Sequence, residues 1–255
     1  MKMLNDSVVW IIGGGSGIGR AIAVMAAEEG ARVWISGRRI GALKETSRIA
    51  AKKNKRAGII TLACDAVDPA QVKTAAADII NKERRIDSLI ISVGWAFAGS
   101  LQDTPFETWR ALEAIHLDSM FLCCREALRG LKKSARANIV IIGSVFGLRG
   151  KENRLAYCTM KGGVVNFVRA LALDLAGSVR VNSICPGWVE TDMSMALVKA
   201  APSPKSALSE RHGWHPMGRG GSPREVADLC VYLVSEKAAW MTGQNIALDG
   251  GYTAR

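Results

Sequence analysis

A glycine-rich segment near the start of the chain constrains the fold most strongly. Gly13, Gly17 and Gly19 stand in the pattern Gly-x3-Gly-x-Gly, between the apolar run 7–12 and a helical pattern that stops at Gly30. A strand, a tight glycine turn and a helix in this order present backbone amides and the positive end of the helix dipole to a pyrophosphate. The segment predicts a dinucleotide-binding βαβ start, with a merely flexible turn as the alternative.

The rest of the chain alternates in the same way. Further apolar runs have the length of buried strands, and helical patterns separate them. With the first run, the strand-like segments are 7–12, 31–36, 58–63, 86–92, 138–143 and 179–184, and later helical segments fall at about 39–54, 69–84, 105–133 and 155–176. Because no hairpin signals join these runs, the pattern predicts an α/β chain with a Rossmann-type, doubly wound parallel sheet and helices on both faces.

The domain organisation follows from the length of the chain and from the absence of a linker. The chain has 255 residues and no Gly/Ser-rich linker, so residues 1–255 are predicted to form one NAD(P)-binding domain. The stretch 192–221 carries Pro202, Pro204 and Pro216 and lacks a clear period. A long segment of this kind in a compact domain is usually functional, so we expect an irregular lid over the substrate.

The end of the second predicted strand indicates which cofactor is bound. NAD-dependent enzymes usually place an acid about 20 residues after the loop, where it binds the ribose 2′-hydroxyl. This chain has Gly37 followed by Arg38 and Arg39 there, and no carboxylate. Two guanidinium groups can pair with a 2′-phosphate. The residues therefore favour NADP(H) over NAD(H), with a pair of solvated arginines at a helix start as the alternative.

A second group of residues carries acid–base potential. Tyr157 and Lys161 are four apart in a predicted helix and share one face. A phenol has an ordinary pKa of about 10, and a nearby ammonium lowers it toward the working range. Ser144 follows the fifth predicted strand, at the sheet edge where ligands bind in such folds. Alone, the Tyr–Lys pair is equally consistent with an ordinary surface pair.

Taken together, these motifs identify a family. The glycine loop, Ser144, Tyr157, Lys161, the segment Pro186-Gly187-x3-Thr191 and the ending 242–251 occur in a fixed order. In that order they resemble the classical short-chain dehydrogenase/reductase family over residues 6–251. The resemblance implies a seven-stranded sheet, a homo-oligomer (tetramer or dimer) and an NADP-dependent oxidoreductase that moves a hydride between nicotinamide and a carbonyl or secondary alcohol.

The resemblance also implies roles for individual residues. Tyr157 would be the general acid/base, Ser144 would hold the reacting oxygen, and Lys161 would bind the nicotinamide ribose and lower the pKa of Tyr157. Cofactor contacts would come from Gly13, Gly15, Ser16, Gly17, Ile18, Gly19, Arg38, Arg39, Asp65, Ala66, Ser92, Gly94, Tyr157, Lys161, Pro186, Gly187, Val189 and Thr191.

Residues beside these motifs are candidates for substrate contact. Large rings and thioethers there favour an apolar or bulky substrate, and the alternative is that they belong to the core or to subunit contacts. The candidates are Trp95, Phe97, Leu148, Trp188 and Met193, with Met195 and Leu197 nearby. His212, Trp214 and His215, at the end of the expected lid, either touch a polar substrate group or pack the lid.

Three positions depart from the family pattern. Ile12 replaces a Thr before the loop, and Ile91-Ser92-Val93-Gly94 replaces Asn-Asn-Ala-Gly, where Ser92 could restore some hydrogen bonding. His116 replaces the Asn of the family's catalytic tetrad, which is linked to a water chain to the Lys. An imidazole could relay protons there, or it could be a buried histidine satisfied by backbone groups.

The remaining features exclude several classes. No run of eighteen apolar residues and no secretion signal occurs, so we expect a cytoplasmic protein without a membrane partner. The six cysteines lack metal spacing, so we expect free thiols and no metal. The net charge of +11 is dispersed over predicted helix ends, at 52–56, 82–85 and 132–136, which disfavours a nucleic-acid partner. A small-molecule substrate is expected. The open alternatives are an NADP-binding isomerase or lyase, and a cofactor-sensing protein with a weakened site.

Overall fold

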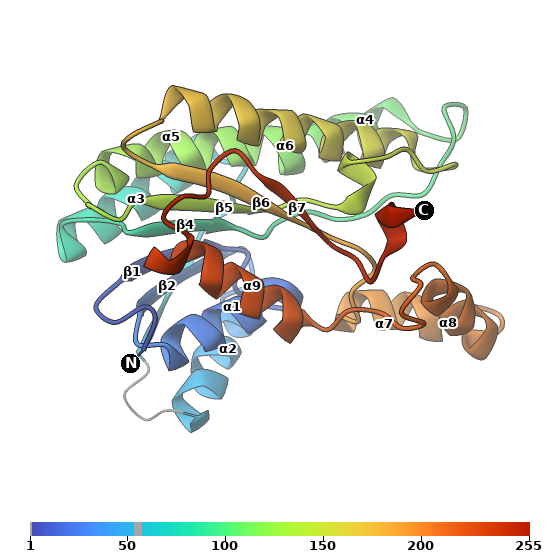
Figure 1. The fold of residues 1–255 in the computed structure, drawn as a ribbon, viewed down its shortest axis with the longest axis horizontal. Helices are drawn as coiled ribbons and strands as arrows, with labels where there is room; N and C mark the ends of the chain where they lie inside the picture. The colour runs from blue at the N-terminus through green and yellow to red at the C-terminus, as the bar shows by residue number, and fades with distance from the viewer. Residues whose placement is uncertain (1, 54–57) are drawn as a thin grey trace.

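A computed structural model describes residues 2–53 and 58–255. In this part of the chain the strands form one parallel sheet in the order β3-β2-β1-β4-β5-β6-β7 (Figure 1). The strands are β1 Val8–Ile12, β2 Arg32–Gly37, β3 Ile59–Ala63, β4 Ser88–Ile91, β5 Asn138–Ile142, β6 Arg180–Pro186 and β7 Asn245–Leu248. The predicted doubly wound Rossmann-type sheet is confirmed.

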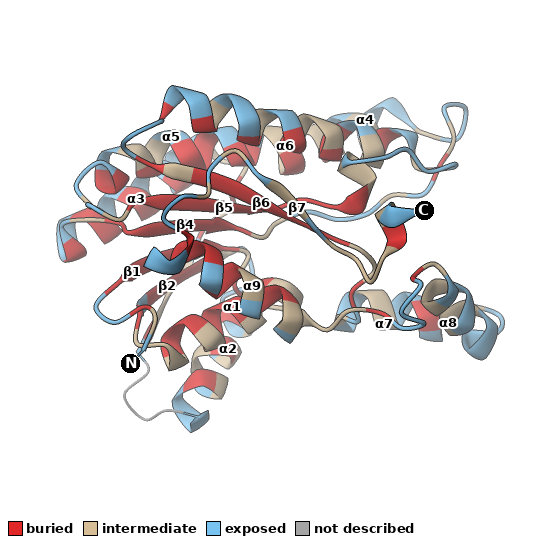
Figure 2. Ribbon diagram, viewed as in Figure 1, coloured by how far each residue is buried: buried red, intermediate tan, exposed pale blue. Residues whose placement is uncertain are grey.

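Helices cover both faces of the sheet, and each face has its own apolar core (Figures 1 and 2). One face packs against α3 Pro69–Glu83, α5 Ser119–Leu131 and α6 Leu155–Asp174, with α4 Phe106–Glu113 beside α6. The other packs against α1 Gly17–Glu28, α2 Ile40–Lys53 and α9 Pro223–Val234. Since central strands such as β1 (VVWII) are buried at every position, they are apolar throughout rather than alternating.

The strand order creates the position of the site. β1 lies between β2 and β4, so the chain crosses to opposite sides of β1 at this point. A crevice opens at the carboxyl ends of the strands where the order reverses in this way. The loops after β1, β2, β4, β5 and β6 all reach that edge.

Several predicted boundaries hold and several do not. α3 begins where the helical segment 69–84 was predicted, with Pro69 as its first residue and Asp68 as its cap, which accepts hydrogen bonds from the amides of Ala70 and Gln71. The predicted helix 105–133 is interrupted by the π-helical turn Ala114–Asp118 between α4 and α5. The elements predicted from residue patterns do not include α9 or β7. β7 is a half-exposed edge strand, and its burial pattern explains the weak signal.

The prediction of an irregular stretch at 192–221 is wrong in part. It contains two short helices, α7 Asp192–Lys199 and α8 Pro204–Gly213, which lie beyond the sheet in Figure 1. Thr191 and Ser194 form a capping box that starts α7, and Pro204 starts α8. Val198 is the only buried residue of the two helices, so they lack the apolar stripe that marks a core helix.

The dispersed basic groups lie at helix ends, as predicted. Lys52 and Lys53 close α2, Arg84 follows α3, and Lys132 follows α5. Lys55 and Arg56, in the first predicted group, lie outside the described residues. Within the described ranges, no helix combines the length and apolar character needed to cross a membrane.

Candidate active site

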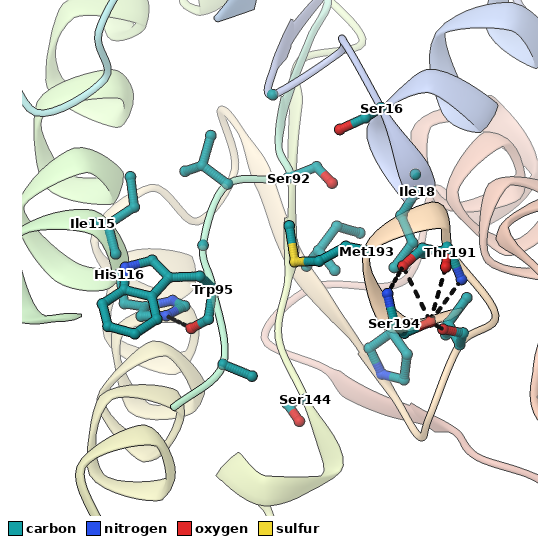
Figure 3. A pocket seen from close by; sticks show the side chains of 18 of the residues that line it. Ser16, Ile18, Ser92, Trp95, Ile115, His116, Ser144, Thr191, Met193 and Ser194 are labelled. Atoms are coloured by element: carbon teal, nitrogen blue, oxygen red, sulfur yellow. Dashed lines mark hydrogen bonds between the residues drawn. The ribbon is translucent and has the colours of Figure 1, made fainter. Parts of the chain in front are cut away.

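A cleft of about 580 Å³ opens at the carboxyl edge of the sheet. Figure 3 shows side chains from both halves of the sheet pointing into it, with Ser16 and Ile18 on one side and His116 and Trp95 on the other. All the cofactor and catalytic residues predicted from the sequence line the cleft except Gly19. Of the predicted substrate residues, Trp95, Trp188 and Met193 line it, whereas Phe97 and Leu148 do not.

The glycine loop is held in a shape that side chains would prevent. The amide of Gly13 donates to the carbonyl of Ser36 at 2.8 Å, and Gly13 has a φ of +87°. A Cβ on Gly19 would lie 2.2 Å from the carbonyl oxygen of Gly13. Gly19 is therefore a packing residue under the loop, which explains why it does not line the cleft.

The loop presents open amides to the cleft. Ser16 precedes α1 without a side-chain hydrogen bond to the first helical amides. Two carbonyl groups of the loop accept hydrogen bonds from side chains. Arg20 donates to the carbonyl of Gly15 at 2.7 Å, and Thr46 donates to that of Gly14 at 3.0 Å. Free amides at a helix N-terminus fit a pyrophosphate. Sequence reasoning missed Arg20 and Thr46, which act through tertiary contacts.

The end of β2 offers positive charge and no acid. Arg38 and Arg39 are exposed at the cleft, and in the described part of the chain neither guanidinium has an ion-pair partner. Asp65 and Ala66, after β3, also line this end. The carboxylate of Asp65 is 3.3 Å from the amide of Val67. The residues present therefore fit an adenosine group with a phosphate on its ribose.

The predicted catalytic residues meet in the cleft. Ser144, which follows β5, is buried, and its hydroxyl accepts from the amide of Phe146 at 3.2 Å. Tyr157 and Lys161 lie one turn apart in α6. The Lys161 Nζ donates to the carbonyl of Ile142 at 2.9 Å and lies 5.9 Å from the centre of the Tyr157 ring.

Burial governs the ionisation of this group. It raises the pKa of Tyr157 to about 12, against the smaller lowering effect of the Ser144 hydroxyl. It also lowers the pKa of Lys161 to about 8. Burial outweighs the neighbouring charges in setting the pKa of Tyr157, and the expected lowering of this pKa by Lys161 stays a prediction. At neutral pH the phenol carries its proton and the ammonium is mostly charged.

His116 lies in the π-helical turn, beside Tyr157. Its Nε2 is 3.0 Å from the carbonyl oxygen of Trp95, so Nε2 carries the hydrogen and donates it (Figure 3). Its ring meets that of Tyr157 edge-on, with centroids 5.6 Å apart. Burial and then the charge of Lys161 lower its pKa to about 3. The imidazole is thus neutral and bonded to backbone, and a Cβ on Gly94 would collide with it.

The segment after β6 is fixed by a histidine whose role the sequence left open. His215 is buried, and its Nδ1 donates a hydrogen bond of 2.6 Å to the carbonyl oxygen of Asp249. Its Nε2 then accepts from the amide of Trp188 at 3.2 Å. A Cβ on Gly187 would lie 2.5 Å from this ring. His215 therefore holds the segment 186–189 against the C-terminal part of the chain.

Aromatic side chains enclose the end of the cleft where Tyr157 lies. Phe97 packs in a small core with Leu112 and Met160, which corrects its assignment to the substrate wall, and Leu148 lies elsewhere on the surface. Sequence reasoning missed Phe146 and Tyr252, whose rings meet at 6.0 Å. Tyr252 directly follows the motif 249–251, which is the one sequence signal near it. Its place in the cleft wall depends on the fold, which brings residues near the end of the sequence to the cleft.

The described residues contain no group of three or more His, Cys, Asp or Glu side chains placed to hold a metal. All six cysteines are free, and all except Cys158 are buried. The side chains that meet around Tyr157 in this cleft offer a phenol, a hydroxyl, an ammonium and an imidazole.

Comparison with known proteins agrees with this geometry. A family model described as Enoyl-(Acyl carrier protein) reductase matches residues 13–253. The chain is 36% identical to 2-(S)-hydroxypropyl-CoM dehydrogenase 3 of Xanthobacter autotrophicus, covering 98% of each chain. It is 35% identical to meso-2,3-butanediol dehydrogenase of Serratia marcescens, covering 98% of this chain and 96% of that one.

A solved structure shows the same fold. A variant of actinorhodin polyketide ketoreductase, solved with NADPH, superposes with a TM-score of 0.92 at 28% identity over 100% of both chains. The match of fold and sequence extends across the whole chain. This protein therefore belongs to the classical short-chain dehydrogenase/reductase family of nicotinamide-dependent oxidoreductases.

Proposed function

We propose that this protein is an NADP(H)-dependent oxidoreductase that interconverts a carbonyl compound and a secondary alcohol. The observation that carries the proposal is the meeting of Ser144, Tyr157 and Lys161 at one end of a cleft whose other end is the glycine loop. The dehydrogenase relatives support the reaction class. Residues 192–221 serve as the lid of this cleft, and the enzyme acts in the cytoplasm.

In the direction of reduction, the chain's residues orient the carbonyl and supply a proton. The bound nicotinamide supplies the hydride when the carbonyl carbon is held against it. Ser144 donates a hydrogen bond to the carbonyl oxygen, and Tyr157, protonated at neutral pH, delivers its proton to that oxygen. The charged Lys161 then stabilises the phenolate that remains. Oxidation of the alcohol runs the same steps in reverse.

His116 acts in this proposal by position. With a pKa of about 3, the imidazole does not gain a proton at working pH. Its hydrogen bond to the carbonyl of Trp95 fixes the loop after β4 beside the cleft. His116 therefore holds this loop through a hydrogen bond and stays neutral throughout the reaction.

The preference for NADP(H) is tested by Arg38→Ala. We expect the wild-type protein to bind NADPH more tightly than NADH, and the substitution to weaken NADPH binding about 10- to 100-fold, because it removes charge-assisted hydrogen bonds to the 2′-phosphate. NADH binding should change little. Quenching of tryptophan fluorescence measures both affinities.

The matched control is Arg224→Ala, which removes an exposed arginine from α9. It should leave the preference intact. Equal affinities for the two cofactors in the wild-type protein would contradict the assignment of Arg38 and Arg39.

The pH dependence of reduction follows from Lys161. Because burial lowers its pKa to about 8, the cation that stabilises the phenolate is present below that pH and is lost above it. We expect kcat for carbonyl reduction to fall as the pH rises through about 8, measured by NADPH consumption between pH 6 and 10. The arginine in Lys161→Arg keeps its charge throughout this range, so any residual activity of this variant should no longer fall as the pH rises through about 8. A wild-type rate that stays constant to pH 10 would rule out this role.

The proposal includes assembly into a homo-oligomer, a tetramer or dimer. Trp240 is fully exposed, and Leu173 and Phe121 are exposed to 79% and 52% on helices α6 and α5. Large apolar side chains of this kind are commonly covered at subunit contacts.

A further inference from the structure

Three basic side chains lie together at the rim of the cleft, at its catalytic end. Lys151 belongs to the loop before α6, Arg154 is the residue that precedes that helix, and Arg211 is on α8. The three do not line the cleft, but their neighbours Tyr157 and Trp214 do. The cluster therefore borders the place where a substrate would project from the site.

Two of these charges lie over the ring of one cleft residue, Trp214. The Lys151 Nζ lies 5.6 Å, and the Arg211 guanidinium carbon 5.9 Å, from the centre of the Trp214 ring. Arg154 immediately precedes the helix that carries Tyr157, and its charge acts to lower the pKa of that residue against the larger effect of burial. Burial, followed by the charge of Arg211, lowers the pKa of Arg154 itself. The structure thus holds a half-buried guanidinium beside another cation.

Glu152 stands between Lys151 and Arg154 in the sequence, but it forms no ion pair with either of them. In the described part of the chain, none of the three cations forms an ion pair, and the Arg211 side chain donates to the carbonyl of Ala207 in its own helix. The nearby Glu190 is bonded to His212 at 3.0 Å. Half-burying a cation beside a like charge is unfavourable unless an anion compensates it.

Two further arginines add to the positive potential and hold the aromatic wall. Arg255 donates to the carbonyl of Trp214 at 2.5 Å, and Arg149 lies over the Tyr252 ring at 5.2 Å. Both arginine side chains donate hydrogen bonds to main-chain oxygens. Arg255 thus holds the backbone at Trp214, and Arg149 lies against the ring of Tyr252, and both aromatic side chains line the cleft.

We propose that the substrate carries an oxyanion, as a carboxylate, sulfonate or phosphate ester, which binds to Arg154, Arg211 and Lys151. Its carbonyl lies at Tyr157 and Ser144, and a short apolar spacer lies against Trp214 and Tyr252. Guanidinium groups bind such oxyanions with directed, charge-assisted hydrogen bonds. This inference rests on the proposed function and defines its substrate class.

The test uses matched ketones. Methyl ketones that end in a carboxylate, sulfonate or phosphonate, with one to three methylenes as spacer, are compared with their uncharged methyl esters. We expect kcat/KM for at least one oxyanion to exceed that of its ester at least tenfold, through KM. The preferred oxyanion identifies which of the three groups the substrate carries.

The preference should fall to less than threefold in Arg154→Gln and in Arg211→Gln, and partly in Lys151→Gln. Because Arg154 also influences Tyr157, the deciding quantity is the ratio of kcat/KM for the oxyanion to kcat/KM for its ester. If Arg154→Gln folds poorly, Arg211→Gln gives the same ratio. Arg129→Gln, which removes an exposed arginine from α5, is the matched control and should keep the ratio.

The outcomes separate this inference from the proposed function. Turnover of acids and esters at equal efficiency would overturn the oxyanion site while supporting the reaction. If no ketone consumes NADPH, the proposed function fails. Tryptophan fluorescence then decides the oxyanion site: binding of an oxyanion, lost in Arg211→Gln, supports it, and equal or absent binding of acid and ester overturns it.

Discussion

Replacement of Tyr157 by Phe is expected to lower kcat for carbonyl reduction by about 10²- to 10⁴-fold, the usual contribution of a general acid. The substitution removes one hydroxyl and leaves the ring. The ring packs edge-on against His116 and Phe146, at centroid distances of 5.6 and 6.3 Å, and Phe preserves both contacts. The affinity for NADPH should therefore change less than threefold, measured by tryptophan fluorescence.

Tyr232→Phe is the matched control, because Tyr232 lies on α9 and its hydroxyl makes one long contact, at 3.4 Å, with the carbonyl of Lys237. It should retain the wild-type rate. The same assay distinguishes redox chemistry from isomerisation, since an oxidoreductase consumes one NADPH per product formed. Wild-type turnover in Tyr157→Phe would show that another group delivers the proton.

Replacement of Gly19 by Ala is expected to lower kcat/KM about 100-fold by displacing the phosphate loop. The added Cβ would lie 2.2 Å from the Gly13 carbonyl oxygen, and the backbone there cannot rotate away as a flexible side chain would. A shift of about 1 Å in a positioning loop is enough for such a loss. We also expect the free energy of unfolding to fall by about 1–3 kcal/mol, as for other overpacked sites. NADPH titration and urea denaturation measure the two effects.

Gly41→Ala is the control, because a Cβ at this position of α2 meets no atom within 4 Å. Alanine favours a helix over glycine, so this variant should be as stable as the wild type or more so. If Gly19→Ala bound NADPH with wild-type affinity, close packing of α1 against the loop would not be what shapes the phosphate site.

Local sequence signals determined much of the fold. The helical pattern predicted that α3 begins at residue 69, and the apolar runs predicted six of the strands to within one or two residues, because these signals act within a few positions of the chain. α9 was missed although Ser222, Pro223 and Glu225 carry a capping box with proline at the first helical position. The edge strand β7 and the helices α7 and α8 bury little, so their patterns are weak.

The sequence alone determined the family, the glycine loop and the order of Ser144, Tyr157 and Lys161, since each depends on residue type and spacing. Only the tertiary structure decided the ionisation of these groups, because burial, which raises the pKa of Tyr157 and lowers those of Lys161 and His116, depends on atoms from several distant segments. It alone joined Arg154 to Arg211, and Trp188 to His215, across 57 and 27 positions of chain. Contacts between segments so far apart leave no local pattern, and they exist only after the sheet and its covering helices have formed.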